Sequence, residues 1–174
     1  MKDILDVIVS RRSIKKFKSQ MVEPELIEKV IVAGTYAPSG KNKQSAIILA
    51  VTNKDVRDNL SKLCAEFRGL KNVDPFYNAP VVLVVLADKN VSTHVYDGSC
   101  VIENMLIEAH SLGLGACWIH HAKEVFETPY AKNLLKNLNI VGDYEGIGCC
   151  ILGYPDMIVG SQLPRKDNYV YYIV

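Results

Sequence analysis

The sequence has no excess of either charge and no long hydrophobic run. Twenty lysines and arginines face 19 acidic residues, which gives a formal net charge of +1. A nearly neutral chain has no overall field that would hold nucleic acid or an anionic membrane surface. Its longest apolar runs, such as residues 81–87, are far shorter than the roughly 20 residues that a membrane-spanning helix needs. We therefore expect neither nucleic acid nor a membrane as a partner.

Patterned cysteines are also missing. The five cysteines are an odd number without C-x-x-C spacing, and Cys149 and Cys150 would point to opposite faces of a strand. We expect no metal site, no disulfide framework, and buried free thiols in a reducing cytoplasm. The start Met-Lys-Asp-Ile leads directly into a helical pattern without a signal peptide. No G-x-S-x-G, H-E-x-x-H or P-loop lysine occurs, which argues against the chemistry of those motifs.

What the chain does contain is enough apolar sequence for a core. A chain of 174 residues, 49% of them hydrophobic, is expected to form one domain over residues 1–174. Apolar spacing and Pro/Gly breaks predict helices over 3–10, from Pro24 to the break at Pro38, and over 54–67, 97–112 and 122–138, the last interrupted at Pro129. Strands are predicted over 46–51, 80–87, 116–119 and 145–153, with a strand-like tail over 169–174. The mixture predicts a layered α/β or α+β domain.

Two surfaces of this expected domain need covering. The helix over 97–112 is apolar around most of its circumference, which indicates burial in the core or against a partner. The tail over 169–174 is apolar as well. Acidic residues on the helix form no paired constellation, so we expect solvated or capping roles for Asp97, Glu103 and Glu108.

Two short segments near the start carry the chemistry. Residues 11–17 read RRSIKKF and gather four cations and a hydroxyl, and residues 37–44 read APSGKNKQ, a loop with Gly, hydroxyl and amide groups. Arginine presents a fork of donors that fits a phosphate, and lysine adds a movable charge. Glycine permits close approach of backbone N–H groups to a ligand. The pair suits a ligand with a phosphate and a polar ring edge, although a solvated charge run would explain the first segment alone.

These segments resemble the paired N-terminal motifs of the nitroreductase family of FMN flavoproteins. Three later segments agree in order, namely GLGACWI at 113–119, ILGYP at 151–155 and PRK at 164–166. The resemblance covers essentially the whole chain and implies an α+β (mixed α/β) nitroreductase-like fold, with a central mixed sheet flanked by helices. It further implies an intertwined homodimer with FMN at the subunit interface, in which the C-terminal strand crosses to the partner's sheet.

The resemblance also implies cofactor-binding residues. Arg11 and Ser13 would grip the FMN phosphate or ribityl chain, with Arg12 in the same segment, and Lys15 would reach the pyrimidine edge of the flavin. A cation there stabilises charge on the reduced ring. The loop of the second motif would come from the other subunit, through Pro38, Ser39, Gly40 and Asn42. A helix-terminating turn without a ligand is the alternative for that loop, and Gln44 is expected to bond backbone groups.

The remaining implied site residues lie in the second half of the chain. Trp118, Ile119 and His120 would pass the reactive face of the flavin, and Arg165 with Lys166 would close on the phosphate. The sequence departs from the family where many members read CWIG, because His120-His121 follow Ile119. Either His120 tunes the pocket or gives protons to a product, or the two histidines are a partly exposed pair after a strand. Leu163 replaces a frequent basic residue.

The implied activity is transfer of hydride from NADH or NADPH through bound FMN to a nitroaromatic, a quinone or a similar small flat acceptor, in a ping-pong cycle. No side chain is needed as a committed acid or base on this interpretation, although Lys15 and His120 could tune the flavin. Two alternatives remain. One is a specialised relative that acts on halogenated phenols or on flavin itself, with residues 66–79 as the candidate lid. The other is a non-catalytic flavin-binding sensor.

Overall fold

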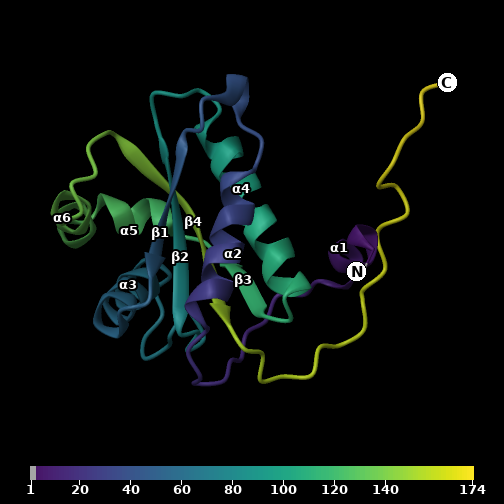
Figure 1. Cartoon of the computed structure of the whole chain (residues 1–174), viewed down its shortest axis with the longest axis horizontal. Coiled ribbons are helices and arrows are strands. Elements are labelled where there is room, and N and C mark those ends of the chain that lie inside the picture. The colour runs from purple at the N-terminus through teal and green to yellow at the C-terminus, as the bar shows by residue number, and fades with distance from the viewer. Residues whose placement is uncertain (1–2) are drawn as a thin grey trace.

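A computed structural model describes residues 3–174 and shows one four-stranded sheet with helices on both faces (Figure 1). The strands are β1 (Ala46–Val51), β2 (Val81–Asp88), β3 (Gly115–Ile119) and β4 (Tyr144–Gly153). The helices are α1 (Ile4–Ser10), α2 (Pro24–Thr35), α3 (Lys54–Phe67), α4 (His94–Ser111), α5 (Ala122–Glu127) and α6 (Pro129–Asn137), with a short 3-10 turn η1 (Gly40–Asn42). Helices α2 and α4 cover one face, and α3 and α5 cover the other.

The order of strands across the sheet is β1-β2-β4-β3, and all three pairings are antiparallel. The family resemblance implies a mixed sheet, with parallel and antiparallel pairings. Among the described residues, the parallel pairing is an isolated bridge between Ser13 and Ala116. The α+β fold class is confirmed. The sheet order places β3 at an edge, beside the chain segment that carries the first motif.

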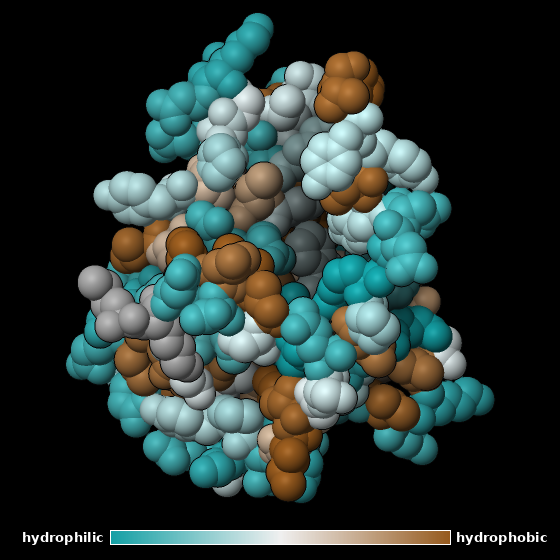
Figure 2. Space-filling model, turned by 90° about the vertical axis from the view of Figure 1, so that its right-hand side faces the viewer, coloured by the Kyte–Doolittle hydropathy of each residue, from teal (hydrophilic) through white to brown (hydrophobic). Residues whose placement is uncertain are grey.

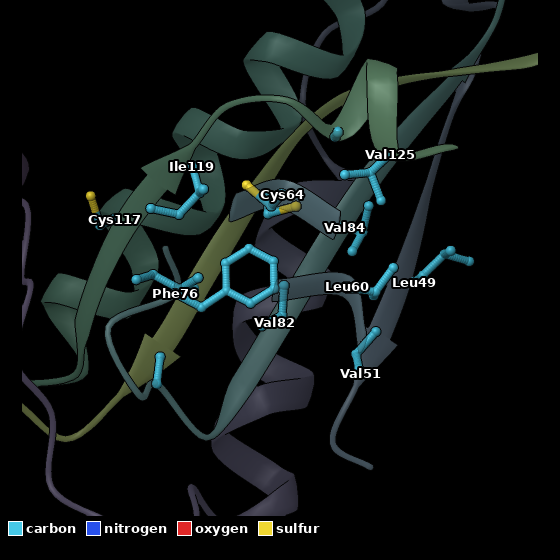
Figure 3. Close-up of a cluster of buried hydrophobic side chains, with 14 of the residues drawn as sticks. Leu49, Val51, Leu60, Cys64, Phe76, Val82, Val84, Cys117, Ile119 and Val125 are labelled. Atoms are coloured by element: carbon cyan, nitrogen blue, oxygen red, sulfur yellow. The ribbon is translucent and has the colours of Figure 1, made fainter. Parts of the chain in front are cut away.

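Strand β2 lies in the middle of the sheet and separates two cores. Val82, Val84 and Leu86 point into the core under α3 and α5, where Phe76 occupies the centre (Figure 3). The other residues of the strand face α2 and α4, namely Val81, Leu83, Val85 and Ala87. Because side chains alternate along a strand, a strand buried on both faces reads as an uninterrupted apolar run, as this one does.

The adjacent Cys149 and Cys150 follow the same rule and lie in different cores. All five cysteines are free thiols, and all but Cys100 are buried, as the sequence predicts. Burial raises the pKa of the Cys150 thiol to about 12 and raises the pKa of Cys149 as well. These thiols pack as small apolar side chains.

Helix boundaries follow local capping. The Asn53 side chain accepts from the Val56 N–H at 3.0 Å, so α3 begins where the sequence predicts. Thr128 accepts from the Ala131 N–H at 3.3 Å, and Pro129 occupies the first turn of α6. The helical segment expected over 122–138 is therefore interrupted at Pro129, as predicted, and forms two helices.

Strand β1 is less buried than its apolar sequence indicates. It is the other edge of the sheet, with three half-buried residues at its start and an exposed Ala50. An edge strand has a neighbour on one side only, so its outer backbone groups are free to pair with another strand. Composition alone does not distinguish such an edge from a central strand.

The tail after β4 leaves the body of the molecule and runs past α1 (Figure 1). Its apolar residues are exposed, with Ile158 at 97% and Ile173 at 101%. The strand expected over 169–174 is not present in the single chain, because a strand requires a partner and the tail has none among residues 3–174. Figure 2 shows hydrophobic side chains scattered over the face that carries α1 and this tail.

No helix within residues 3–174 combines the length and apolar character needed to cross a membrane.

Candidate functional site

A cavity of about 390 Å³ lies beside β3. Five of the predicted site residues line it together: Ser13, Lys15, Trp118, Ile119 and His120. Four further lining residues come from the end of α3, the loop before β2, the middle of β3 and the turn after β3: Arg68, Tyr77, Cys117 and His121. The lining therefore includes a lysine, an arginine, two histidines and no carboxylate.

Backbone contacts hold the first motif against β3. The N–H of Ile14 donates to the Ala116 carbonyl at 3.0 Å, and Phe17 bridges to Pro155 beyond the end of β4. The Ile14 side chain packs against Gly115, where an added Cβ would lie 2.9 Å from Ile14 Cγ2. Between these contacts, the exposed Ser13 and Lys15 are carried to the mouth of the cavity.

The edge of β3 itself forms one wall. The Ala116 carbonyl points outward from the sheet to meet Ile14, so the backbone groups of Trp118, two residues on, face the same side. After Ile14 the first motif runs toward Pro155, beyond the Gly115 end of β3, and so moves away from Trp118. The Trp118 backbone thus lies along the cavity, where a ring with donors and acceptors on its edge could hydrogen-bond to it.

The basic residues of the first motif differ in their surroundings. Arg12 Nη1 donates to the carbonyls of Val9 at 2.8 Å and Arg11 at 2.7 Å, and so caps the end of α1. Arg11 is half-buried, and its guanidinium has no hydrogen bond or ion pair within residues 3–174. Lys15 Nζ lies 5.8 Å from the centre of the Tyr77 ring. Arg11 is therefore the more available anion ligand of the two arginines.

The loop over 68–79 brings Tyr77 to the cavity and is ordered by Asp74. This carboxylate accepts from the N–H groups of Phe76 at 2.9 Å and Asn78 at 2.6 Å, and it pairs with the buried Arg57. Burial opposes ionisation of Asp74, but the hydrogen bonds of Arg57 and its neighbours outweigh it and lower the pKa. The candidate lid is thus a cavity wall with its own buried anchor.

The second motif lies elsewhere, at the start of α4. Asp97 is 4% exposed and accepts from the Gly40 N–H at 3.0 Å, from Ser45 Oγ at 2.7 Å and from Thr93 Oγ1 at 3.1 Å. The solvated or capping role expected for Asp97 is wrong, because the carboxylate is buried and binds the loop of the second motif. Its three hydrogen-bond donors compensate the burial of its charge. Burial opposes ionisation here too, yet the donors lower the pKa of Asp97 overall.

This loop has an unusual backbone. Lys41, Asn42 and Gln44 have φ values of 51°, 52° and 48°, a region that non-glycine residues seldom adopt and that is often found at functional sites. The Gln44 amide donates to the Asn42 side chain at 3.2 Å, rather than to the backbone as expected. A second groove, of about 330 Å³, runs from Pro38 and Ser39 along the start of β1.

The two motifs do not meet within one chain. Asp97 holds the second motif near the start of α4, whereas Ala109, twelve residues along the helix, accepts from the Leu114 N–H where the chain turns into β3. At 1.5 Å per residue this separation is about 18 Å along the axis. None of residues 37–44 lines the β3 cavity, and Pro38 and Ser39 line the separate second groove instead.

The C-terminal basic residues are also away from the cavity. Arg165 and Lys166 lie in the exposed tail, and Lys166 Nζ lies 5.4 Å from the centre of the Tyr169 ring. No group of three or more potential metal ligands occurs among the residues that the structure describes.

Sequence reasoning missed Arg68, Tyr77, Asp97 and His121 as parts of these two regions. An Asp followed by Pro75 in a loop is a signal for a turn anchored by its side chain, which could have indicated the ordered loop. Nothing in the spacing of Arg68 and Tyr77 indicates that they approach Lys15, since the three come together only through tertiary packing.

Comparison with known proteins gives consistent results. The model of the Nitroreductase family matches residues 8–154. A protein of Methanothermobacter thermautotrophicus, provisionally named NADH dehydrogenase/NAD(P)H nitroreductase, is 32% identical over 67% of this chain and 60% of its own length. A protein of Archaeoglobus fulgidus with the same provisional name is 31% identical over 68% of each chain. The chain thus spans about three fifths of the length of the first of these relatives.

Solved structures agree over nearly the whole chain. A nitroreductase of Bacteroides fragilis with bound FMN superimposes with a TM-score of 0.87 at 24% identity, covering 99% of this chain and 100% of that one. An FMN-dependent nitroreductase of Clostridium difficile gives a TM-score of 0.80 at 27% identity, covering 97% and 98%. The first likeness concerns the fold alone, whereas the second joins the fold to a sequence relationship.

Proposed function

This chain belongs to the nitroreductase family, and on that premise we propose that it is an FMN-dependent oxidoreductase. It takes hydride from NADH or NADPH and passes electrons to a small flat acceptor such as a nitroaromatic or a quinone. The observation that carries the proposal is the β3 cavity, in which Ser13 and Lys15 lie beside the open backbone of Trp118. Names of relatives, including the NADPH-flavin oxidoreductase of Vibrio harveyi at 26% identity over 68% of this chain, support the donor.

The residues around the cavity fit FMN by their chemistry. Arg11, which does not itself line the cavity, has a guanidinium without a hydrogen-bond or ion-pair partner among residues 3–174, and Ser13 has an exposed hydroxyl; both groups suit a phosphate. Lys15 and Arg68 favour a ring edge that becomes more negative on reduction. Bound FMN would supply two-electron hydride chemistry at its ring. The protein's part is to hold the ring against β3, limit access of water and present one cavity to donor and acceptor in turn, which supports a ping-pong cycle.

The homodimer with FMN at the subunit interface is part of the proposal. None of Pro38, Ser39, Gly40 and Asn42 lines the β3 cavity of its own chain, which supports a partner that contributes them. The free outer edge of β1 and the unpaired apolar tail support exchange of the C-terminal strand. On this arrangement Arg165 and Lys166 approach a phosphate only after the tail has docked. Twelve residues of extended tail would span up to about 40 Å, enough to carry them across an interface.

One sheet with a core on each face supports a single domain over residues 1–174. Five free cysteines support a reducing, cytoplasmic location.

The experiment is an absorption spectrum of the purified protein with and without added FMN, followed by anaerobic addition of NADH and NADPH. We expect a flavin spectrum that bleaches with one or both donors. Bound flavin that neither donor bleaches would overturn the reductase and favour the sensor. Absence of flavin binding would overturn the cofactor. Sedimentation of the FMN-loaded protein tests the dimer, and a monomer that binds FMN tightly would refute the shared site.

A further inference from the structure

Two adjacent histidines close one end of the β3 cavity. His120 is exposed and His121 is half-buried, and their ring centroids are 5.0 Å apart in an edge-to-face contact. Both also border a small apolar crevice behind the cavity, lined by Cys64, Phe76 and neighbouring core residues. His121 thus lies between the cavity and the dry core rather than in open solvent.

The backbone of His121 is held in a conformation that suits glycine better. Its φ is 73°, in the left-handed region, and its carbonyl accepts from the Val125 N–H at 3.1 Å as α5 begins. The next residue, Ala122, packs so closely under Gly146 that an added Cβ there would lie 2.2 Å from the Ala122 backbone. A strained, tightly held residue at a cavity wall is a reason to look for a role of its side chain.

The side chain has a carboxylate partner. His121 Nδ1 lies 3.5 Å from Glu124 Oε2, within ion-pair distance but outside hydrogen-bond geometry, and both atoms are buried without a hydrogen-bond partner among the described residues. A buried carboxylate oxygen requires a donor, and a small rotation of either side chain would aim an Nδ1 proton at Oε2 and satisfy both atoms. The ring's other nitrogen, Nε2, then remains for exchange with the cavity. A histidine whose one nitrogen is fixed by a carboxylate is the usual arrangement for proton transfer through the other.

The other charges near the pair leave this arrangement intact. The neighbouring Lys123 is paired with Glu145 at 3.1 Å rather than with Glu124. The ionisable groups that share the cavity with His121 are Lys15, Arg68, Tyr77, Cys117 and His120. None of them is a carboxylate, so Glu124 is the acidic partner that the structure offers to His121.

We propose that His121, oriented by Glu124, donates the proton that completes reduction of the second substrate. The proposal rests on the proposed function, which supplies the electrons. For a quinone, bound reduced FMN would supply a hydride, that is two electrons and one proton, to one carbonyl oxygen. The other oxygen takes the Nε2 proton of the protonated imidazole, which gives the hydroquinone. The imidazole keeps its Nδ1 proton, which points toward Glu124. Water then returns a proton to Nε2. His121 is then a catalytic residue, and Glu124 a positioning residue.

The substitution His121→Gly tests the proposal without threatening the fold, because glycine adopts a φ of 73° freely. General acids contribute 10²–10⁴-fold, so we expect about 100-fold slower quinone reduction in H121G. Glu124→Ala keeps the imidazole but removes the group that orients it, so we expect quinone reduction to be about 10-fold slower than in wild type. Glu127→Ala, an exposed carboxylate on the same helix, is the matched control and should match wild type.

Stopped-flow measurements separate the steps. Reduction of bound FMN by NADH or NADPH should remain within about twofold of wild type in all variants, as should electron transfer to ferricyanide, which accepts an electron without a proton. Equal losses with quinone and ferricyanide would indicate damage to the flavin site and overturn the proposal, as would normal quinone reduction in H121G. Failure of wild-type protein to bind FMN or to be reduced would instead overturn the proposed function.

A measurement on the flavin-free protein is independent of activity. In wild type, the Nδ1 proton of His121 should appear in imidazole-selective NMR spectra as a slowly exchanging, hydrogen-bonded proton. The signal should be lost in Glu124→Ala and kept in Glu127→Ala. If it is missing in wild type, or survives in Glu124→Ala, Glu124 does not orient the ring.

Discussion

Replacement of Asp97 by alanine should release the loop over 37–44 and destabilise the protein. The carboxylate accepts three hydrogen bonds while 4% exposed. Hydrogen bonds to a charged group contribute about 1.5–3 kcal/mol each. The two hydroxyls of Ser45 and Thr93 can turn toward other acceptors, but the Gly40 N–H cannot. We therefore expect a net loss of about 3 kcal/mol for Asp97→Ala, less than the sum of the three bonds, because removal also ends the cost of burying a charge.

The effect should be greatest at Gly40. Its N–H loses its acceptor, and the left-handed residues Lys41, Asn42 and Gln44 lose the contact that holds the start of their turn. Hydrogen exchange at the Gly40 amide should accelerate more than exchange in β2. Under the proposed function this loop meets FMN in the partner subunit, so FMN affinity should fall at least about tenfold, the equivalent of about 1.4 kcal/mol.

Urea unfolding of the apoprotein measures the first effect, and flavin titration the second. Glu103→Ala removes the same charge from an exposed position on the same helix and should change stability by less than about 0.5 kcal/mol. Asp97→Asn keeps one acceptor oxygen, so its loss of stability should lie between those of Asp97→Ala and Glu103→Ala. If Asp97→Ala unfolds at the same urea concentration as Glu103→Ala, the carboxylate does not hold the loop and the reasoning is refuted.

Three further predictions concern other parts of the fold. Arg11→Ala should lower the FMN content of purified protein, and unchanged content would remove Arg11 from the site. Gly146→Ala should cost about 3 kcal/mol or more, because its Cβ would lie 2.2 Å from the rigid Ala122 backbone; a melting temperature like that of wild type would contradict the close packing. The pKa of Asp74 is lowered below 3.8 by its hydrogen bonds with Arg57 and others, against burial, so its stabilisation is present above about pH 4 and is lost as pH falls further. In Asp74→Asn, the free energy of unfolding should therefore depend less on pH below about pH 4 than it does in wild type. An unchanged pH dependence would show that Asp74 does not contribute this stability.

Most elements of the fold could be predicted from local sequence. Helix α3 matches because Asn53 caps it and its apolar spacing is regular. Strand β2 matches because its composition leaves no alternative. The break before Pro129 also follows from local chemistry. These features are encoded within a few residues of where they occur.

The site was only partly predictable. Ser13, Lys15, Trp118 and His120, which the family resemblance implies as site residues, line one cavity. The burial of Asp97 was not predictable, because its donors Gly40 and Ser45 are more than 50 residues away in sequence. The wall formed by residues 68–79 likewise depends on long-range packing. Features built from distant segments require the structure, whereas motifs that carry their own turn do not.

The division of the cysteines between two cores has a consequence for chemical durability. Reduced flavins can pass electrons to oxygen, so an enzyme of the proposed kind would produce peroxide near its own surface. Peroxide attacks thiolates, and burial raises the pKa of Cys64 to about 11, which leaves roughly one part in 10⁴ ionised at pH 7. Cys149 and Cys150 are shielded further. Oxidative damage to the thiols would therefore begin at the half-exposed Cys100 or at Cys117, which lines the cavity, and the two cores would protect Cys64, Cys149 and Cys150 from this by-product.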